Sequence, residues 1–222
     1  MSREASAEPA PVDGPSLPEQ PGAAEHRRLR LILAGVLLLA SLALHTPGFF
    51  QPISFDETYR TFSGPFNDWW DWAWRDVHNP LYNIAMRGWI TLFGDTEAVI
   101  RIPTVLFAHI TALALGLWAG RRFGPWTGLT AAAVFLLNPA QVLHAVTAKN
   151  NAFTVMWGVL FVILLDTLRR DPRPRRVALC TLAGILGVYT DWAFLYALLP
   201  ASIMVAIDAR RDGRAFRALV FC

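Results

Sequence analysis

The sequence predicts an all-α membrane protein, a polytopic transmembrane helical bundle with about six crossings. Three observations lead to this fold class. The 222 residues are 54% hydrophobic and 17% charged, whereas soluble domains usually carry about 25% charged residues. The charges are missing from long apolar blocks and gather in short arginine clusters between them, which is typical of membrane proteins. The net charge of +3 therefore does not indicate nucleic-acid binding, because the basic residues mark helix ends and not one folded face.

The chain begins with a polar tail. Residues 1–25 are rich in Pro, Ala and Glu and contain almost no large apolar side chain, so we expect a disordered cytoplasmic tail that cannot bury a core. The long polar start and the lack of a small-x-small cleavage site favour an uncleaved anchor over a signal peptide. Residues 26–222 are expected to form one transmembrane domain.

The apolar blocks approach the length of about 20 residues that a bilayer requires. The first four crossings are expected within residues 31–50, 102–119, 126–144 and 152–168. The block at 177–207 holds one charge near its middle, Asp191, and basic residues at both ends. It is therefore interpreted as a tight hairpin of two short crossings.

The arginine clusters set the expected orientation. If the first four blocks cross once each and the block at 177–207 crosses twice, the clusters at 27–30, 121–122, 169–176 and 210–217 all fall on one side. Cytoplasmic loops hold the excess of Lys and Arg, so we expect a multi-pass protein of the cell membrane with a cytoplasmic N-terminus. A further apolar segment begins at Phe216 just before the chain ends, and from this we expect a chain truncated at its C-terminus.

The first outer loop, residues 51–101, is expected to carry juxtamembrane amphipathic helices. The run from Ser54 to Glu57 fits a capping box that starts a short helix. Over residues 66–77, aromatic side chains recur every three or four positions, and tryptophan favours the membrane–water interface. Asn79-Pro80 predicts the start of a third helix, and Gly94 predicts its end.

Several short motifs follow the first expected crossing in a fixed order. They are Phe55-Asp56-Glu57, His78-Asn79-Pro80-Leu81-Tyr82, Trp89, Leu92-Phe93-Gly94 and Arg101-Ile102-Pro103. Together they resemble the N-terminal part of the GT-C superfamily of membrane glycosyltransferases, in particular protein O-mannosyltransferase-like enzymes and lipid A aminoarabinose transferases. The resemblance implies a cell-envelope enzyme that transfers a sugar from a polyprenyl-phosphate-linked donor to an acceptor on the extracytoplasmic face. It leaves the sugar and the acceptor open.

The resemblance implies that Asp56 and Glu57 are the catalytic residues. A carboxylate in hydrogen-bond reach of the acceptor hydroxyl can accept its proton as the phosphate is displaced. The alternative is a structural role, in which Glu57 closes the capping box and Asp56 complements the helix dipole.

Candidate substrate-binding residues are Arg60, His78, Arg101 and Lys149. A phosphate leaving group needs cations, which Arg and Lys supply, and Lys149 is the one lysine in the sequence. The alternative for Arg101 and Lys149 is that they only snorkel to lipid head groups. The resemblance allows a divalent metal cofactor near His78, but no metal ligands are assigned because the sequence shows no second ligand beside it.

Two other function classes remain open at this point. Family members usually have more crossings and a C-terminal soluble domain, so the chain could be a non-catalytic partial member that binds lipid or a partner. A small transporter would instead show broken helices or repeats at mid-membrane, and the two halves of the sequence show no repeat.

The expected orientation gives a labelling prediction. In a background without native cysteines, a single cysteine at Asp71 should react with an impermeant maleimide added outside the cell, and one at Arg173 should be protected. Equal labelling at both positions would contradict the alternation of the arginine clusters.

Overall fold

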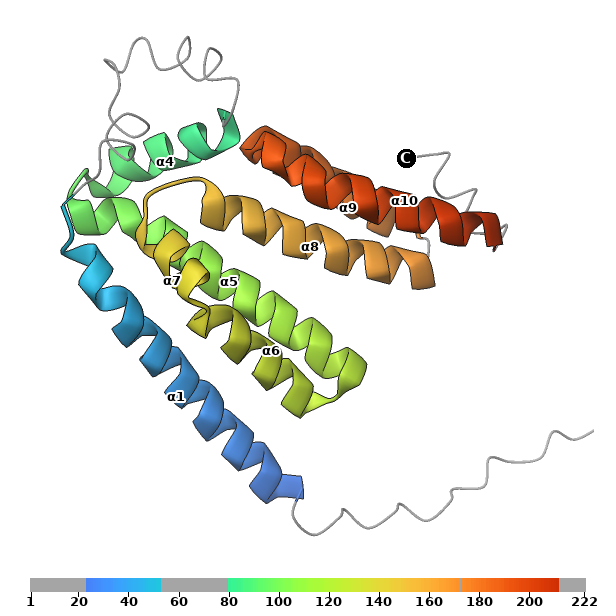
Figure 1. Ribbon diagram of the computed structural model, residues 1–222, viewed down its shortest axis with the longest axis horizontal. Coiled ribbons are helices and arrows are strands. Elements are labelled where there is room, and N and C mark those ends of the chain that lie inside the picture. The colour runs from blue at the N-terminus through green and yellow to red at the C-terminus, as the bar shows by residue number, and fades with distance from the viewer. Residues whose placement is uncertain (1–22, 53–79, 172, 212–222) are drawn as a thin grey trace, which may run out of the picture.

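The computed structural model describes residues 23–52, 80–171 and 173–211, and the secondary structure within them is helical, which confirms the all-α class. The elements are α1 (Ala23–Phe49), α4 (Pro80–Phe93), α5 (Glu97–Phe123), α6 (Pro125–Leu137), α7 (Pro139–Val146), α8 (Asn151–Arg170), α9 (Pro174–Thr190), the short 3-10 helix η2 (Trp192–Phe194) and α10 (Leu195–Arg211) (Figure 1). The first two helices expected in the outer loop lie outside the described residues.

Local signals in the sequence set the helix ends. Helix α4 begins at Pro80 and is followed by Gly94, which has a φ of 91°, as the Asn79-Pro80 and Gly94 signals predict. Gly124 separates α5 from α6 with a φ of 104°, a conformation that glycine adopts without a steric penalty. The side chain of Asn138 caps α7 by accepting a hydrogen bond from the backbone N of Ala140 at 2.9 Å.

The expected apolar blocks all form helices, but the count of six crossings is not confirmed. Helices α1, α5 and α8 are each long and apolar enough to cross a membrane. Helices α6 and α7 pass the same test only as a pair, bent by 61° at the break between them. Helices α9 and α10 have 17 residues each. By length and composition the described residues therefore hold three spans, or four if the bent pair is one.

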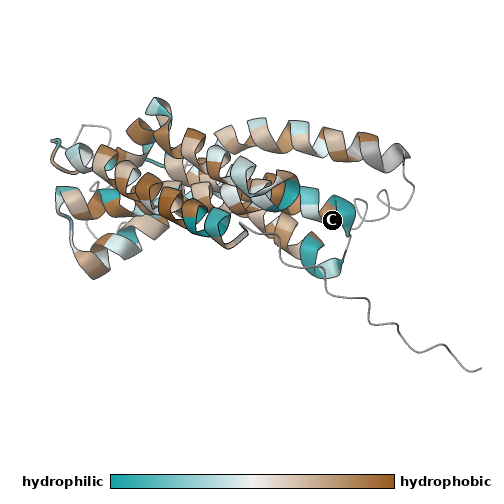
Figure 2. Ribbon diagram, turned by 90° about the horizontal axis from the view of Figure 1, so that it is seen from below, coloured by the Kyte–Doolittle hydropathy of each residue, from teal (hydrophilic) through white to brown (hydrophobic). Residues whose placement is uncertain are grey.

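The surface of these helices suits a lipid environment. Leu31 and Leu39 on α1 are 66% and 68% exposed, and large apolar side chains are also exposed on α5, α6 and α10. Figure 2 shows hydrophobic residues along the helices and hydrophilic residues toward their ends. Such broad apolar exposure marks a membrane surface or a large interface.

Helices α1, α5, α6, α8, α9 and α10 run in alternating directions, which gives the bundle two distinct ends (Figure 1). At one end Arg101 of α5 contacts the last residues of α1, and Asn150 contacts Asp191. We call this the α4 end, because α4 lies there. At the other end Trp118 contacts Asp166, and Arg176 contacts the backbone at 167. We call this the arginine end, because the described clusters at 121–122 and 169–176 lie there.

The hairpin of α5 and α6 is closely packed through glycine. A Cβ atom placed on Gly128 would lie 2.3 Å from the carbonyl O of Gly116 and 2.7 Å from the Cα of Gly120. Within a membrane, small residues let helix backbones approach and gain van der Waals contact, because lipid offers no hydrophobic driving force between helices. This contact therefore depends on the missing side chain at Gly128.

Gly128→Ala should lower the thermal unfolding midpoint in detergent micelles, because overpacking costs about 1–3 kcal/mol. Gly158→Ala on α8 is the matched control: nothing lies within 4 Å of its added Cβ, and alanine is the better helix former by about 1 kcal/mol. Equal midpoints for the two variants would contradict the close α5–α6 contact.

Candidate functional site

Helix α4 lies against the rest of the bundle at the α4 end. Its Tyr82 and Met86 are 1% and 3% exposed and pack in one core cluster with Ile100 of α5 and with Phe153 and Met156 of α8. The rings of Phe107 and Phe153 stack in the same cluster with their centroids 4.4 Å apart. This core fixes α4 on the bundle beside the turns that carry the polar residues.

The guanidinium of Arg101 lies under the end of α1 and is 2% exposed. Its Nη1 donates to the carbonyl O atoms of Gly48 and Gln51, both at 2.6 Å, and its Nη2 donates to that of Pro52 at 3.2 Å. The last carbonyls of a helix have no partner within the helix, and a cation there also complements the helix dipole. Arg101 is thus buried on backbone carbonyls and does not snorkel to head groups.

The turn between α7 and α8 presents Lys149. The Lys149 side chain is half-buried between two neighbours that are 0% and 3% exposed, Ala148 and Asn150. Ala148 belongs to the core cluster under α4. The backbone N of Lys149 donates to the carbonyl O of Thr147 at 2.7 Å. The position of the lysine is therefore fixed from both sides along the chain.

A hydrogen bond joins this turn to the turn after α9. The side-chain Nδ2 of Asn150 donates to Oδ2 of Asp191, while Oδ1 of Asp191 accepts from the backbone N of Ala193 at 2.8 Å. The carboxylate thus caps η2 and holds the Lys149 turn at once. The sequence interpretation did not identify this link, although Asp191 stood out as an isolated acid in an apolar block.

The side chains of His45, His109 and His144 have structural partners inside the bundle. Oγ of Ser41 lies 3.4 Å from Nδ1 of His45 and 3.2 Å from Nε2 of His109, which joins α1 to α5. Nδ1 of His144 lies 3.1 Å from Nδ2 of Asn151 at the start of α8. These contacts hold neighbouring helices together.

The described residues test only part of the predicted site. Arg101 and Lys149 both lie at the α4 end, while Asp56, Glu57, Arg60 and His78 lie outside the described residues and stay predictions. Among the residues with described positions, no group of three or more His, Cys, Asp or Glu side chains could hold a metal ion. The divalent metal near His78 also stays a prediction.

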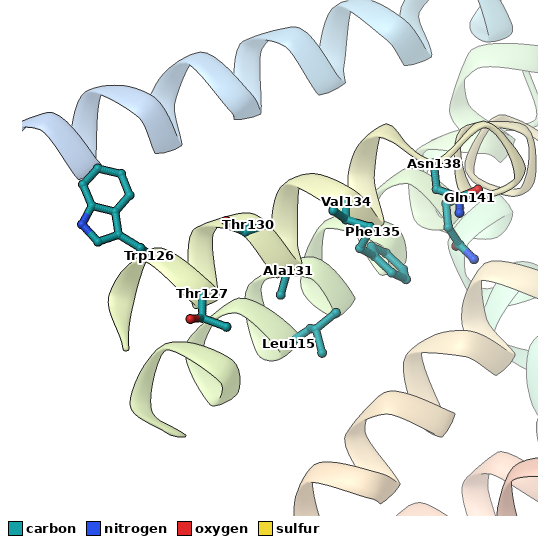
Figure 3. Close-up of a pocket in the computed structure, with 9 residues that line it drawn as sticks. All are labelled: Leu115, Trp126, Thr127, Thr130, Ala131, Val134, Phe135, Asn138 and Gln141. Atoms are coloured by element: carbon teal, nitrogen blue, oxygen red, sulfur yellow. The ribbon is translucent and has the colours of Figure 1, made fainter. Parts of the chain in front are cut away.

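A groove of about 760 Å³ follows α6 past the break at Asn138. Figure 3 shows its lining, which comes mainly from α6 and includes Leu115 of α5. Thr127, Thr130, Asn138 and Gln141 are its polar residues, and no charged residue lines it. It offers no group for proton transfer or for neutralising a phosphate, so the α4 end is the better candidate for chemistry.

The described residues form a helical membrane protein that holds Arg101, Lys149 and the Asn150–Asp191 bond at one end. The family model for dolichyl-phosphate-mannose-protein mannosyltransferases matches residues 77–218. The match covers well over half of the chain, so the chain belongs to this family of GT-C-type membrane glycosyltransferases. It includes His78, Arg101 and Lys149 and begins after Asp56, Glu57 and Arg60. No curated protein and no solved structure matches the chain with significance.

The Asn150–Asp191 bond can be tested by exchanging its partners. Asn150→Asp should lower the thermal unfolding midpoint, because a hydrogen bond to a charged group contributes about 1.5–3 kcal/mol and two carboxylates would now face each other. The double variant Asn150→Asp with Asp191→Asn restores one amide and one carboxylate and should recover most of the loss. If the midpoint of the double variant falls by as much as the two single-variant losses added together, the contact is contradicted.

Proposed function

We propose that the chain transfers a sugar from a polyprenyl-phosphate-linked donor to an acceptor hydroxyl on the extracytoplasmic face of the membrane. The observation that carries the proposal is the gathering of Lys149 and the polar turns at one end of a bundle that belongs to a mannosyltransferase family. The arginine-rich end of the bundle is cytoplasmic by the positive-inside rule. The N-terminus of α1 is then cytoplasmic too, and the α4 end faces outward.

The proposed reaction is a displacement at the anomeric carbon of the donor sugar. The acceptor oxygen forms a bond to this carbon as the bond from the carbon to the phosphate oxygen breaks. Asp56 accepts the proton of the acceptor hydroxyl, and Glu57 lies beside it in the sequence. The polyprenyl phosphate leaves with the electron pair, and cations near it stabilise its developing charge.

Lys149 and Arg60 are the proposed partners of the leaving phosphate. Lys149 suits this role because its turn is fixed by Ala148 in the core and by the Asn150–Asp191 bond. A cation held in place before the reaction stabilises a developing charge without further reorganisation. His78 lies two residues before the start of α4 and is proposed to contact the same substrate.

The proposed role of Arg101 is to position the catalytic segment. Arg101 fixes the carbonyl O of Pro52, and Asp56 follows Pro52 by four residues in the sequence. The same stretch of α5 reaches the Lys149 side of the site, because Oγ1 of Thr104 donates to the carbonyl O of Ala145 at 2.7 Å. One turn of α5 therefore connects both parts of the proposed site.

Asp56→Asn should reduce transfer by about 10²–10⁴-fold, which is what a general base contributes, with membrane insertion unchanged. Lys149→Ala should lower kcat and kcat/KM for the donor, because it removes a charge that stabilises the leaving phosphate. The assay is transfer of labelled mannose from a polyprenyl-phosphate donor in membranes, with mannose chosen for the family's name.

Asp95→Asn is the matched control, since Asp95 is an exposed carboxylate in the connection between α4 and α5. It should leave transfer unchanged. Near-normal turnover of Asp56→Asn would show that Asp56 serves only as a neighbour of a helix cap, and the mechanism proposed above would be wrong.

A further inference from the structure

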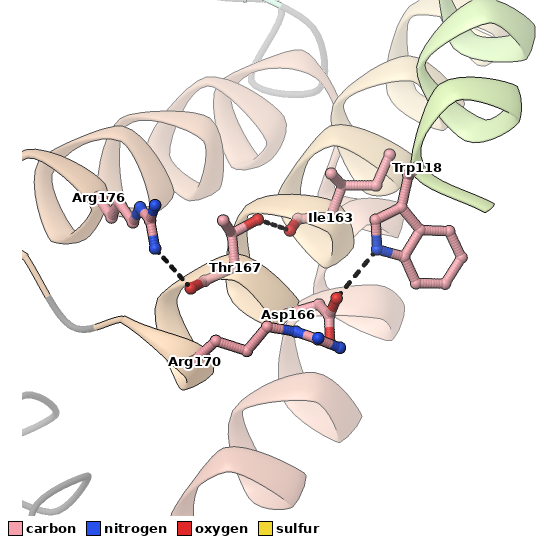
Figure 4. A network of polar contacts seen from close by, with 6 residues as sticks. All are labelled: Trp118, Ile163, Asp166, Thr167, Arg170 and Arg176. Carbon is pink, nitrogen blue, oxygen red and sulfur yellow. Dashed lines mark hydrogen bonds and ion pairs between the residues drawn. The ribbon is translucent and has the colours of Figure 1, made fainter. Parts of the chain in front are cut away.

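The arginine end is organised by two carboxylates. Asp166 of α8 accepts hydrogen bonds from Nε1 of Trp118 at 3.0 Å and from Nη2 of Arg170 at 3.2 Å. Figure 4 shows these side chains. One turn further, Asp171 forms ion pairs with Arg173 at 2.8 Å and with Arg176 at 3.0 Å. These contacts join α5, α8 and the start of α9, so the arginines of two separate turns are held at one end.

The described charges at this end do not balance. In the turns after α5 and α8, two carboxylates, Asp166 and Asp171, stand against seven arginines: Arg121, Arg122, Arg169, Arg170, Arg173, Arg175 and Arg176. The start of α1 adds Arg27, Arg28 and Arg30 against Glu25. Asp166 and Asp171 are already engaged as described above, and no hydrogen bond or ion pair joins Arg121 or Arg175 to another described residue. Arg121, Arg122 and Arg175 are exposed, and much of the surplus positive charge lies on them.

The α4 end differs in this respect. Its described cations, Arg87, Arg101 and Lys149, are matched in number by its described acids, Asp95, Glu97 and Asp191. The surplus is therefore a property of one end and not a general feature of the helix ends.

Apolar side chains are exposed directly beside these arginines. Phe123 and Trp126 between α5 and α6 are 62% and 44% exposed, and Leu179 on α9 is 41% exposed. The guanidinium of Arg122 lies 5.9 Å from the ring centroid of Phe123. Cations that border exposed apolar and aromatic groups match the level at which lipid head groups meet acyl chains. This favours a lipid over a soluble polyanion.

We infer that the arginine end binds anionic phospholipid head groups of the leaflet that it faces. The guanidinium group suits this ligand, because its planar donors match two phosphate oxygens at once. The inference goes beyond the proposed function, since these lipids are bound at the opposite end from the proposed site and are not consumed. It extends the arginines' role beyond orienting the chain during insertion.

The test uses the purified full chain in nanodiscs that contain phosphatidylcholine and phosphatidylglycerol in equal amounts. Native mass spectrometry then counts the lipids that stay bound after release into detergent. The wild-type chain should retain phosphatidylglycerol preferentially. The variant with Arg121→Gln, Arg122→Gln and Arg175→Gln should lose this preference by about fivefold for each arginine removed.

Arg87→Gln is the matched control, because it removes a cation from the α4 end, and it should keep the preference. Thermal unfolding in pure phosphatidylcholine checks that the triple variant is folded, and its exposed positions predict an unchanged midpoint. Equal retention of the two lipids by wild-type protein would mean that the arginines act only in orienting the chain. Displacement of phosphatidylglycerol by soluble glycerol phosphate would show an ordinary anion site and would also overturn the inference.

Discussion

The burial of the Arg101 guanidinium is the interaction on which the α4 end depends. An uncompensated buried charge costs several kcal/mol, and here the carbonyls of Gly48, Gln51 and Pro52 compensate it. Those carbonyls lie at the end of α1, where no helix hydrogen bond occupies them fully. The contact with Arg101 therefore holds the end of α1 at this level of α5. Thr104, three residues further, holds α7 by its bond to Ala145. The exit of α1 and the turn with Lys149 are therefore both positioned from one part of α5.

Much of the fold could be predicted because its signals are local. The apolar blocks, the Asn79-Pro80 start and the Gly94 end each lie within a few residues, and each forms the expected helix or boundary. The bend of 61° between α6 and α7 was not predicted, although Asn138-Pro139 is a known breaking signal. Residues 126–144 were interpreted as one crossing because their length suited a bilayer. A helix of 17 residues is about 26 Å long, which is why α9 and α10 leave the crossing count unconfirmed.

The candidate site was less predictable, because its contacts join distant parts of the sequence. The charge of Arg101 suggested a phosphate ligand, and only the tertiary structure shows that the partners of the side chain include backbone carbonyls about 50 residues earlier. Asn150 and Asp191 are 41 residues apart, and nothing in either local sequence indicates the other. The position of Lys149 was predictable, since the alternation of the arginine clusters already assigns its turn to the opposite end.

The two ends of the bundle present cations in physically different ways. Near Lys149 the described cations and acids are equal in number, and core packing fixes the turn. A lysine held in this way suits stabilisation of a single phosphate as it leaves. At the arginine end the guanidinium groups outnumber the carboxylates and several are exposed, which suits exchangeable head groups bound by many weak contacts. The fixed Lys149 turn is therefore the reason for proposing chemistry at the α4 end, and the exposed arginines are the reason for proposing lipid binding at the other end.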